Sequence, residues 1–318
     1  MASFEGFDRP LFKRLAHNDT GQSSGHQAGI VIPKDLDRYF PDLRSKIGET
    51  GATADENIRA ALFVGKKLPE VVSTRYQYQT WGGTRSPERR ITGNLSAFRS
   101  EASAGDFVLI ERSLSDPNFF RMRLIRSSDP EFAHVNASAN GRKCGPSIAD
   151  EKPMPERTVQ DALDAQAAHE AKPLAIFDND ALLVESRAVR MARSQAFQRS
   201  VTKLYSFRCA VCGNGLASPT GLCEIEAAHI VPRSLKGADD ARNGLALCRS
   251  HHWAFDRGLF GVTAGNQIMI PAKVMALPQN SHLLPFDSRA LSQPTVQRLA
   301  PSPVALEWHL KNIVIRHQ

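Results

Sequence analysis

Membrane-spanning segments and a disulfide framework are two features that this 318-residue sequence lacks. It has no apolar run of the roughly 18 residues that a spanning helix needs. Its five cysteines are too few, and odd in number, for a disulfide scaffold, and its first residues have no apolar core like that of a secretory signal. Average contents of hydrophobic residues (42%) and charged residues (23%) exclude a fibre or a wholly disordered chain. We therefore expect a cytoplasmic protein of two or three domains that contacts no membrane.

The charge of the chain is distributed unevenly. Forty basic and 33 acidic residues give a net charge of +7. The net charge is +3 over residues 1–130, −5 over 131–185, +6 over 186–260 and +3 over 261–318. Two basic segments around an acidic one are typical of a protein that binds a polyanion such as nucleic acid. Ordinary solvated surface is the alternative, and the charge alone does not decide between them.

The first part of the chain has the pattern of β-structure. Short runs of β-branched and apolar residues between turn formers predict strands within 25–33, 105–113 and 119–127. The last of these alternates apolar and basic residues, as a half-buried strand does. The segment 54–65 is expected to be a helix. We therefore expect a mostly-β N-terminal region with a few short helices.

The middle of the chain has the composition of a connection between domains. Residues 133–157 are polar and rich in Gly, Pro, Ser and Asn. A short helix is expected at 156–172, and a longer one at 186–205, where apolar residues recur at helical spacing opposite a basic face. The predicted parts are an N-terminal domain (1–132), a linker with a short helix (133–185), and a C-terminal domain with an extension (186–318). In that extension, residues 261–318 are expected to add a strand pair and a tail.

Two residue pairs at metal-ligand spacing are the strongest local signal. Cys209 and Cys212 form a CxxC pair, and Cys248 and His251 form a CxxH pair at the start of an expected helix. A CxxC turn lets two thiolates hold one ion, and the second pair supplies the other corners of a tetrahedron. Buried free cysteines are the alternative. We predict that these four residues bind a structural Zn²⁺ ion.

Three further strings lie between and beyond these pairs: EIEAAHIVP (224–232), NGLALC (243–248) and HHWAFDRG (251–258). Over about residues 193–263 this succession resembles the HNH endonuclease family, whose fold is a ββα-metal finger. The resemblance implies a metal-dependent deoxyribonuclease. In it, His229 corresponds to the general base, Asn243 to the residue that holds the loop, and His252 to the ligand of the catalytic metal.

The chemistry of phosphodiester hydrolysis agrees with these residue types. A water molecule must lose a proton near neutral pH, a task suited to an imidazole side chain, which His229 supplies. A divalent cation, Mg²⁺ or another, stabilises the charge that develops on the phosphate. Asp256 lies four residues after His252, so both would project from one face of a helix toward the same ion. A salt bridge at the helix end is the alternative role of Asp256.

The sequence departs from the family at one position. Many members carry Asp or His immediately before the base, as a second metal ligand, and this chain has Ala228. A site that uses His252 with Asp256 or Glu226 would compensate for that difference. A decayed nuclease module in a DNA-binding regulator is the alternative function.

Basic residues of the helix expected at 186–205 also suggest contact with DNA. Gln195, Arg199 and Lys203 recur at four-residue steps, so they share one face of that helix. We expect Arg199 and Lys203 to approach DNA phosphates, with a solvated face as the alternative.

The N-terminal part contains a second set of distinctive strings, NDTG at 18–21 with GHQ at 25–27, and TRSPERRIT at 84–92. Together they resemble the effector domain of EcoRII-type restriction enzymes, a DNA-binding pseudobarrel, over about residues 10–125. The resemblance implies two arms that read the major groove, where Arg pairs with guanine and Glu accepts from cytosine. By position these arms carry His26 and Gln27 on the first, and Arg85, Glu88, Arg89 and Arg90 on the second.

The two resemblances imply the same substrate, double-stranded DNA. We therefore predict a mixed α+β fold with an N-terminal mostly-β DNA-binding pseudobarrel, a linker and a C-terminal zinc-stabilised ββα-metal HNH finger. The predicted function is a site-specific endonuclease, a restriction enzyme. Because one finger usually cuts one strand, cleavage of both strands implies a homodimer. Restriction that depends on modified DNA is a further alternative.

Overall fold

The computed structural model of the chain describes residues 6–20, 29–43, 46, 53–80, 86–147, 152–178 and 186–317. It divides into two compact units. The first contains Met1–Thr158 and Ser218–Leu222, and the second contains Val159–Ala217 and Cys223–Gln318. The fold is mixed α and β, as predicted. No helix of the described residues is long and apolar enough to cross a membrane.

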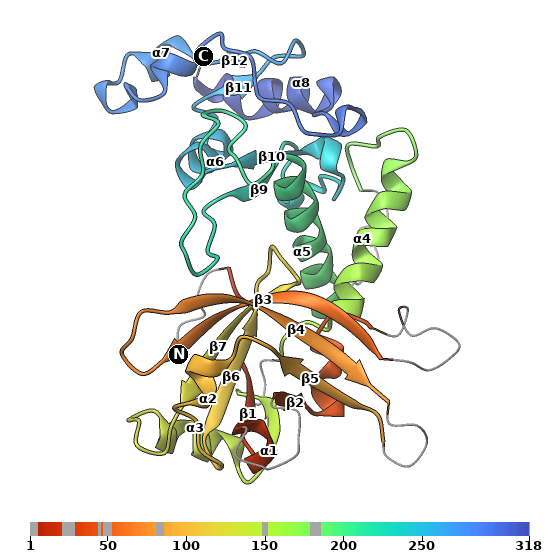
Figure 1. The fold of residues 1–318 in the computed structure, drawn as a ribbon. Helices are drawn as coiled ribbons and strands as arrows, with labels where there is room; N and C mark the ends of the chain where they lie inside the picture. The colour runs from red at the N-terminus through yellow and green to blue at the C-terminus, as the bar shows by residue number, and fades with distance from the viewer. Residues whose placement is uncertain are drawn as a thin grey trace. The chain divides into compact units, whose positions relative to one another are not determined.

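The first unit is built on one curled sheet, which forms a half-barrel (Figure 1). In the described residues its strand order is β2-β5-β4-β3-β7-β6-β1-β8. Neighbouring strands are antiparallel except for β3 and β7, which are parallel. The strands are β1 (Leu11–Arg14), β2 (Ile30–Ile32), β3 (Ala54–Val64), β4 (Glu70–Gln79), β5 (Glu88–Thr92), β6 (Phe107–Arg112), β7 (Phe119–Ile125) and β8 (Cys144–Pro146). The short helices are α1 (His17–Thr20), η1 (Lys34–Tyr39), α2 (Ser96–Arg99) and α3 (Phe132–Ala139).

Aromatic side chains fill the core of this half-barrel. The ring of Phe40 stacks on Tyr76 and on Phe120, with a centroid distance of 5.0 Å in each case. The strands predicted at 25–33, 105–113 and 119–127 are confirmed as β2, β6 and β7.

The helix expected at 54–65 is wrong, because this segment is the strand β3. It pairs with β4 on one side and β7 on the other, so its neighbours satisfy its backbone groups. Ile58, Ala60 and Leu62 are buried at alternate positions. Ala60 and Ala61 of this strand are buried in the centre of the sheet.

The segment with linker composition also contributes to the first unit. Phe132, Val135 and Ala139 of α3 pack against Phe12 and Phe107. Strand β8 pairs with β1 at the edge of the sheet. The part of the predicted linker up to residue 147 is therefore ordered structure.

The second unit combines two small sheets with helices around them. Its sheets pair β9 with β10 and β11 with β12, both antiparallel. Its longer elements are α5 (Arg187–Leu204), β9 (Glu226–His229), β10 (Gly244–Leu247), α6 (Arg249–Asp256), β11 (Gly261–Val262), β12 (Ile268–Met269) and α8 (Pro303–Asn312). Its shorter helices are η4 (Arg233–Leu235), η5 (Ala241–Asn243), α7 (Ala272–Met275), η6 (Pro278–Asn280), η7 (Leu284–Phe286), η8 (Gln297–Leu299) and η9 (Val314–His317). Helix α4 (Glu156–Glu170) includes the boundary between the units.

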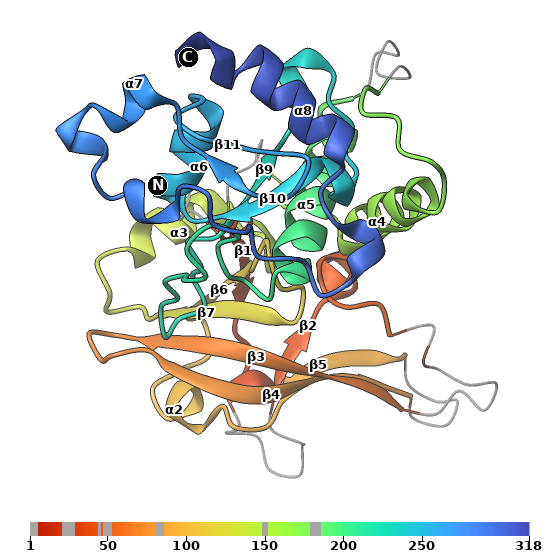
Figure 2. The same cartoon turned by 90° about the horizontal axis from the view of Figure 1, so that it is seen from above.

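The predicted helices of this region are confirmed as α4 and α5. Ser186 caps α5, since its hydroxyl oxygen accepts a hydrogen bond from the Val189 amide at 3.3 Å. The strand pair expected after residue 261 is confirmed as β11 and β12, and α8 lies beside β11 (Figures 1 and 2).

Candidate active site and metal centre

A ββα arrangement brings the predicted nuclease residues together. Strands β9 and β10 form a hairpin in which His229 pairs with Gly244 and Glu226 pairs with Leu247. Helix α6 starts directly after the hairpin. His229 therefore lies at the end of β9, Asn243 stands just before β10, and His252 projects from α6.

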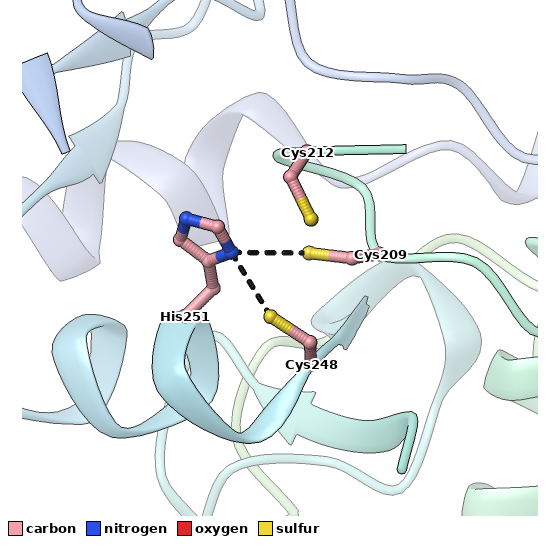
Figure 3. A group of neighbouring side chains, drawn as sticks. All are labelled: Cys209, Cys212, Cys248 and His251. Carbon is pink, nitrogen blue, oxygen red and sulfur yellow. Dashed lines mark hydrogen bonds between the residues drawn. The ribbon is translucent and has the colours of Figure 1, made fainter. Parts of the chain in front are cut away.

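The four predicted zinc ligands converge on one point. Figure 3 shows the sulfur atoms of Cys209, Cys212 and Cys248 and the ring of His251 facing one another. Their ligand atoms all lie within 4.8 Å of one another. The Nδ1 atom of His251 lies 3.0 Å from Cys248 Sγ and 3.5 Å from Cys209 Sγ. Among the described residues, these four form the one group of three or more possible metal-binding side chains whose ligand atoms lie this close together.

The thiols of this group affect one another's pKa values. A hydrogen bond to Cys248, together with burial, raises the pKa of Cys209 to about 11. Burial likewise raises the pKa of Cys212, whereas the hydrogen bond from Cys209 lowers that of Cys248. Without a cation, thiol protons therefore form the hydrogen bonds among these sulfur atoms. A zinc ion would replace those protons and hold the sulfur atoms as thiolates.

Asn243 closes the loop between the two strands. The fully buried side chain accepts a hydrogen bond from the Val231 amide at 2.9 Å, and its Nδ2 donates to the carbonyls of Val231 (3.2 Å) and Ala238 (2.9 Å). Gly237 leaves the space that this arrangement needs, because a Cβ there would lie 1.8 Å from the Val231 carbonyl oxygen. The loop-holding role expected of Asn243 agrees with these contacts.

His229 has a defined orientation. Its ring stacks on Phe197 of α5 at a centroid distance of 3.8 Å and an interplanar angle of 11°. Its Nε2 lies 2.9 Å from Oδ1 of Asp239. Asp239 is not among the predicted site residues, and its place in the polar loop between His229 and Asn243 is its sequence signal.

Two arginines contact the second oxygen of Asp239. Arg193 Nη2 lies 3.0 Å and Arg233 Nε lies 3.6 Å from its Oδ2. Burial alone would raise the pKa of Asp239, but the hydrogen bond with His229 and the charges of Arg233 and Arg193 outweigh it. The net effect lowers this pKa, so the carboxyl group is ionised at neutral pH.

His252 lies between two carboxylates. Its Nδ1 is 2.7 Å from Oε2 of Glu226, and its Nε2 is 3.5 Å from Oδ2 of Asp256. The predicted one-face relation of His252 and Asp256 agrees with this geometry. Arg249 Nε also contacts Glu226, at 3.3 Å. Imidazole nitrogen and carboxylate oxygen are donors that a divalent cation accepts.

Ala228, at the position where the HNH resemblance implies a second metal ligand, is fully buried in the core of this unit and has no side-chain atom that could bind a metal. Glu226, two residues earlier on the same strand, supplies the carboxylate that contacts His252 instead.

Helix α5 supports this site in a way that its sequence did not indicate. Gln198 donates to the Ile225 carbonyl at 3.1 Å and accepts from the Ala227 amide at 2.7 Å, which joins α5 to β9. Lys203 is exposed, as expected for a DNA contact. The structure differs for Arg199, which is 5% exposed because its part of α5 packs against the hairpin.

The predicted arm residues of the N-terminal unit fall into two groups. His26, Gln27 and Arg85 lie outside the described residues. Glu88, Arg89 and Arg90 belong to β5.

Both arginines of β5 are held by contacts within the unit. Arg89 lies 2.9 Å from Asp37 and covers the ring of Tyr78 at 5.0 Å. Arg90 differs from the expectation of a groove-reading side chain. It is only 5% exposed, because β5 pairs with β4 on one side and with β2 on the other. Its guanidinium group donates to Glu88 at 3.2 Å.

The NDTG string has a structural role that the sequence did not show. The carboxylate of Asp19 accepts hydrogen bonds from the amides of Ala16 at 2.7 Å and Val31 at 2.8 Å, and it pairs with Lys13. This buried group therefore joins the chain before the first predicted arm to the strand after it.

Comparison with known families identifies the segment that contains the hairpin and α6. Residues 209–263 match the model of the HNH endonuclease family. This segment is an HNH endonuclease domain. The HNH domain contains all the predicted catalytic and zinc-binding residues, whereas Arg193 precedes it. No curated protein matches the chain.

Several solved structures are similar to the chain. The Arabidopsis FUS3–DNA complex is 22% identical, with 37% of this chain and 96% of that chain covered, at a TM-score of 0.27. The UbaLAI restriction endonuclease B3 domain with cognate DNA is 20% identical, with 45% and 83% covered, at 0.31. The modification dependent TagI restriction endonuclease is 13% identical, with 98% and 97% covered, at 0.33.

Proposed function

We propose that the protein is a site-specific DNA endonuclease of the restriction type, which hydrolyses phosphodiester bonds with His229 as the general base. The observation that carries the proposal is the HNH domain, in which His229 ends β9, Asn243 precedes β10 and His252 lies on α6. The N-terminal unit would recognise the DNA sequence, and the HNH domain would cut it.

His229 would accept a proton from the attacking water. Ionised Asp239 can only accept hydrogen bonds, so the Nε2 of His229 is the donor in their contact. The Nδ1 atom of the neutral ring then carries the lone pair that takes the proton. Asn243 keeps the loop that holds Asp239 in place, through its bonds to Val231 and Ala238.

His252 and Asp256 would hold the catalytic cation. Glu226 accepts a hydrogen bond from Nδ1 of His252, which leaves Nε2 on the side of Asp256. A carboxylate that orients a metal-binding histidine in this way is common in metal sites. When bound, Mg²⁺ or another divalent cation would stabilise the charge that develops on the scissile phosphate. The Zn²⁺ ion at Cys209, Cys212, Cys248 and His251 would be structural.

Digestion of genomic DNA tests the proposal. Methylated and unmethylated DNA are incubated with Mg²⁺ or Mn²⁺, and the fragment ends are sequenced. Discrete fragments with a shared sequence at their ends are expected. His229→Ala should lower the rate by about 10²- to 10⁴-fold, the usual contribution of a general base. His282→Ala is the matched control, because His282 is exposed in the same unit and outside the HNH domain.

Two other outcomes would change the assignment. Specific binding without cleavage would favour a DNA-binding regulator, a function that Ala228 makes a real alternative. Cleavage of methylated DNA alone would show modification-dependent restriction. Cleavage of both strands further requires two copies of the chain, so we propose a homodimer on DNA, which sedimentation with and without DNA would test.

The exposed Lys203 tests how the second unit contacts DNA. We expect Lys203→Ala to weaken binding to all sequences alike and to reduce the salt dependence by about one phosphate contact. An unchanged salt slope would remove Lys203 from the interface.

A further inference from the structure

A network of alternating charges reaches His229 from a part of the chain that precedes the HNH domain. Asp178 lies 2.6 Å from Arg193 Nη2 and 3.0 Å from Arg233 Nη1. The same two arginines contact Oδ2 of Asp239, whose Oδ1 contacts His229. Two carboxylates therefore share two guanidinium groups, and one oxygen of Asp239 remains for the histidine.

The position of Asp178 is fixed by backbone contacts. Its amide donates to the Lys236 carbonyl at 2.8 Å, and the Ala238 amide donates to the Ile176 carbonyl at 3.1 Å. Phe177 and Gly237 form an isolated antiparallel bridge between these bonds. Residues 176–178 thus pair with the loop that contains Asp239. This pairing places the Asp178 carboxylate beside Arg193 and Arg233.

Charge balance gives this arrangement its effect. Burial would raise the pKa of Asp178, but the hydrogen bonds from Arg193 and Arg233 outweigh it and lower this pKa. Both carboxylates are therefore ionised. Without Asp178, both guanidinium groups would lose a carboxylate partner and could turn further onto Asp239, where they would compete with His229 for its oxygens. Asp178 thus accepts part of the hydrogen bonding of Arg193 and Arg233, and Oδ1 of Asp239 stays available to accept a hydrogen bond from His229.

We propose that Asp239 is the positioning residue of the general base, and that Asp178 is a second positioning residue that acts through Arg193 and Arg233. The proposal rests on the proposed function, in which His229 is the base. It extends the catalytic apparatus beyond the matched residues 209–263 to the segment before α5. The HNH domain would therefore depend on that segment for its full activity.

The ring tautomer of His229 gives a test that needs no catalysis. In full-length protein labelled with ¹⁵N-histidine, the signals of His229 are assigned by their loss in His229→Ala. The expected state is Nε2–H with an unprotonated Nδ1. Asp239→Asn should populate the other tautomer, because an amide can donate to Nε2 as well as accept from it. An unchanged tautomer in Asp239→Asn would overturn the proposal.

Cleavage under single-turnover conditions at saturating DNA gives the second readout. We expect Asp239→Asn to reduce the rate by about 10²- to 10⁴-fold and Asp178→Asn by about 10- to 100-fold. The DNA dissociation constant should stay within about twofold of the wild-type value in each, since neither residue is assigned a contact with DNA. Asp239→Glu should recover part of the rate. Asp164→Asn, an exposed carboxylate of α4 in the same unit, is the matched control.

The two proposals can fail separately. If wild-type protein does not cleave DNA, the proposed function fails, while the tautomer measurement still decides whether Asp239 orients His229. If Asp239→Asn loses its fold in a thermal melt, Asp239→Glu and Asp178→Asn carry the test. Equal losses of rate in Asp178→Asn and Asp164→Asn would overturn the role of Asp178.

Discussion

The two units of this protein reach a stable fold in different ways. The first has one sheet of eight strands in its described residues, with a core that includes the stacked rings of Phe40, Tyr76 and Phe120. The second has two-stranded sheets, which are at most marginally stable alone. It places helices around them and gathers three cysteines and a histidine in its interior. Both units bury an apolar core, and the second also has four grouped side chains through which a bound ion would add to its stability.

Removal of zinc should produce the largest difference in stability between the two units. Structural zinc contributes on the order of 10 kcal/mol to folding in small zinc domains. A strong chelator, or Cys209→Ser, should therefore unfold the HNH domain and leave the first unit folded. Hydrogen–deuterium exchange by peptide would show loss of protection in β9, β10 and α6 and retained protection in β3, β4 and β7.

Cys223→Ser is the control for that experiment. Cys223 is only partly buried in the same unit and is not among the four grouped ligands. Its substitution should leave the zinc content and the exchange pattern close to those of wild type. Equal loss of protection in both units after zinc removal would contradict the comparison, because it would make the metal a support of the whole chain.

The stability of the first unit depends on a buried charged residue, Arg112. This buried side chain lies 3.0 Å from Asp8 and 2.7 Å from Glu156, and it donates to the Met154 carbonyl at 2.7 Å. Arg112→Met would leave both carboxylates without their cation, at a cost of about 3–5 kcal/mol in the free energy of unfolding. Urea unfolding followed by peptide exchange would place this loss in the first unit.

The pH dependence of Arg112→Met provides an internal check. Burial raises the pKa of Asp8 despite the opposing charge of Arg112. A carboxyl group with a raised pKa in the folded state favours folding at low pH and loses that contribution as the pH rises. The loss in Arg112→Met should therefore shrink on acidification. Arg59→Met, at a pair whose arginine side chain is 61% exposed, should cost no more than about 1 kcal/mol.

The sequence predicted those features that depend on local spacing. The zinc ligands follow from two pairs whose members are three residues apart in the chain, and α5 follows from helical periodicity. Strands β6 and β7 follow from short apolar runs between turns. In each case neighbouring residues carry enough information to fix the structure, since the turn or helix itself sets the geometry.

Features that depend on partners distant in the chain were not predicted. Residues 54–64 form a strand because β4 and β7 lie on either side, although their alanine content favours a helix. Arg90 and Arg199 are basic residues whose burial only the packed structure reveals. The contact of Asp178 with Arg233 joins residues 55 positions apart, and no spacing rule identifies such a pair.

His309 provides a further test, which concerns the pH dependence of the stability of the second unit alone. This buried ring stacks on Phe255 at 3.8 Å, and burial lowers its pKa to about 4. The unfolded chain takes up the proton near the ordinary value of 6.5, so stability is full above pH 6.5 and falls as the pH drops toward 4. The maximum loss is about 3 kcal/mol. His309→Phe keeps an aromatic ring there and should flatten this dependence for the second unit, while the exposed control His282→Phe should not. The same acid dependence in His309→Phe and wild type would assign it to other groups.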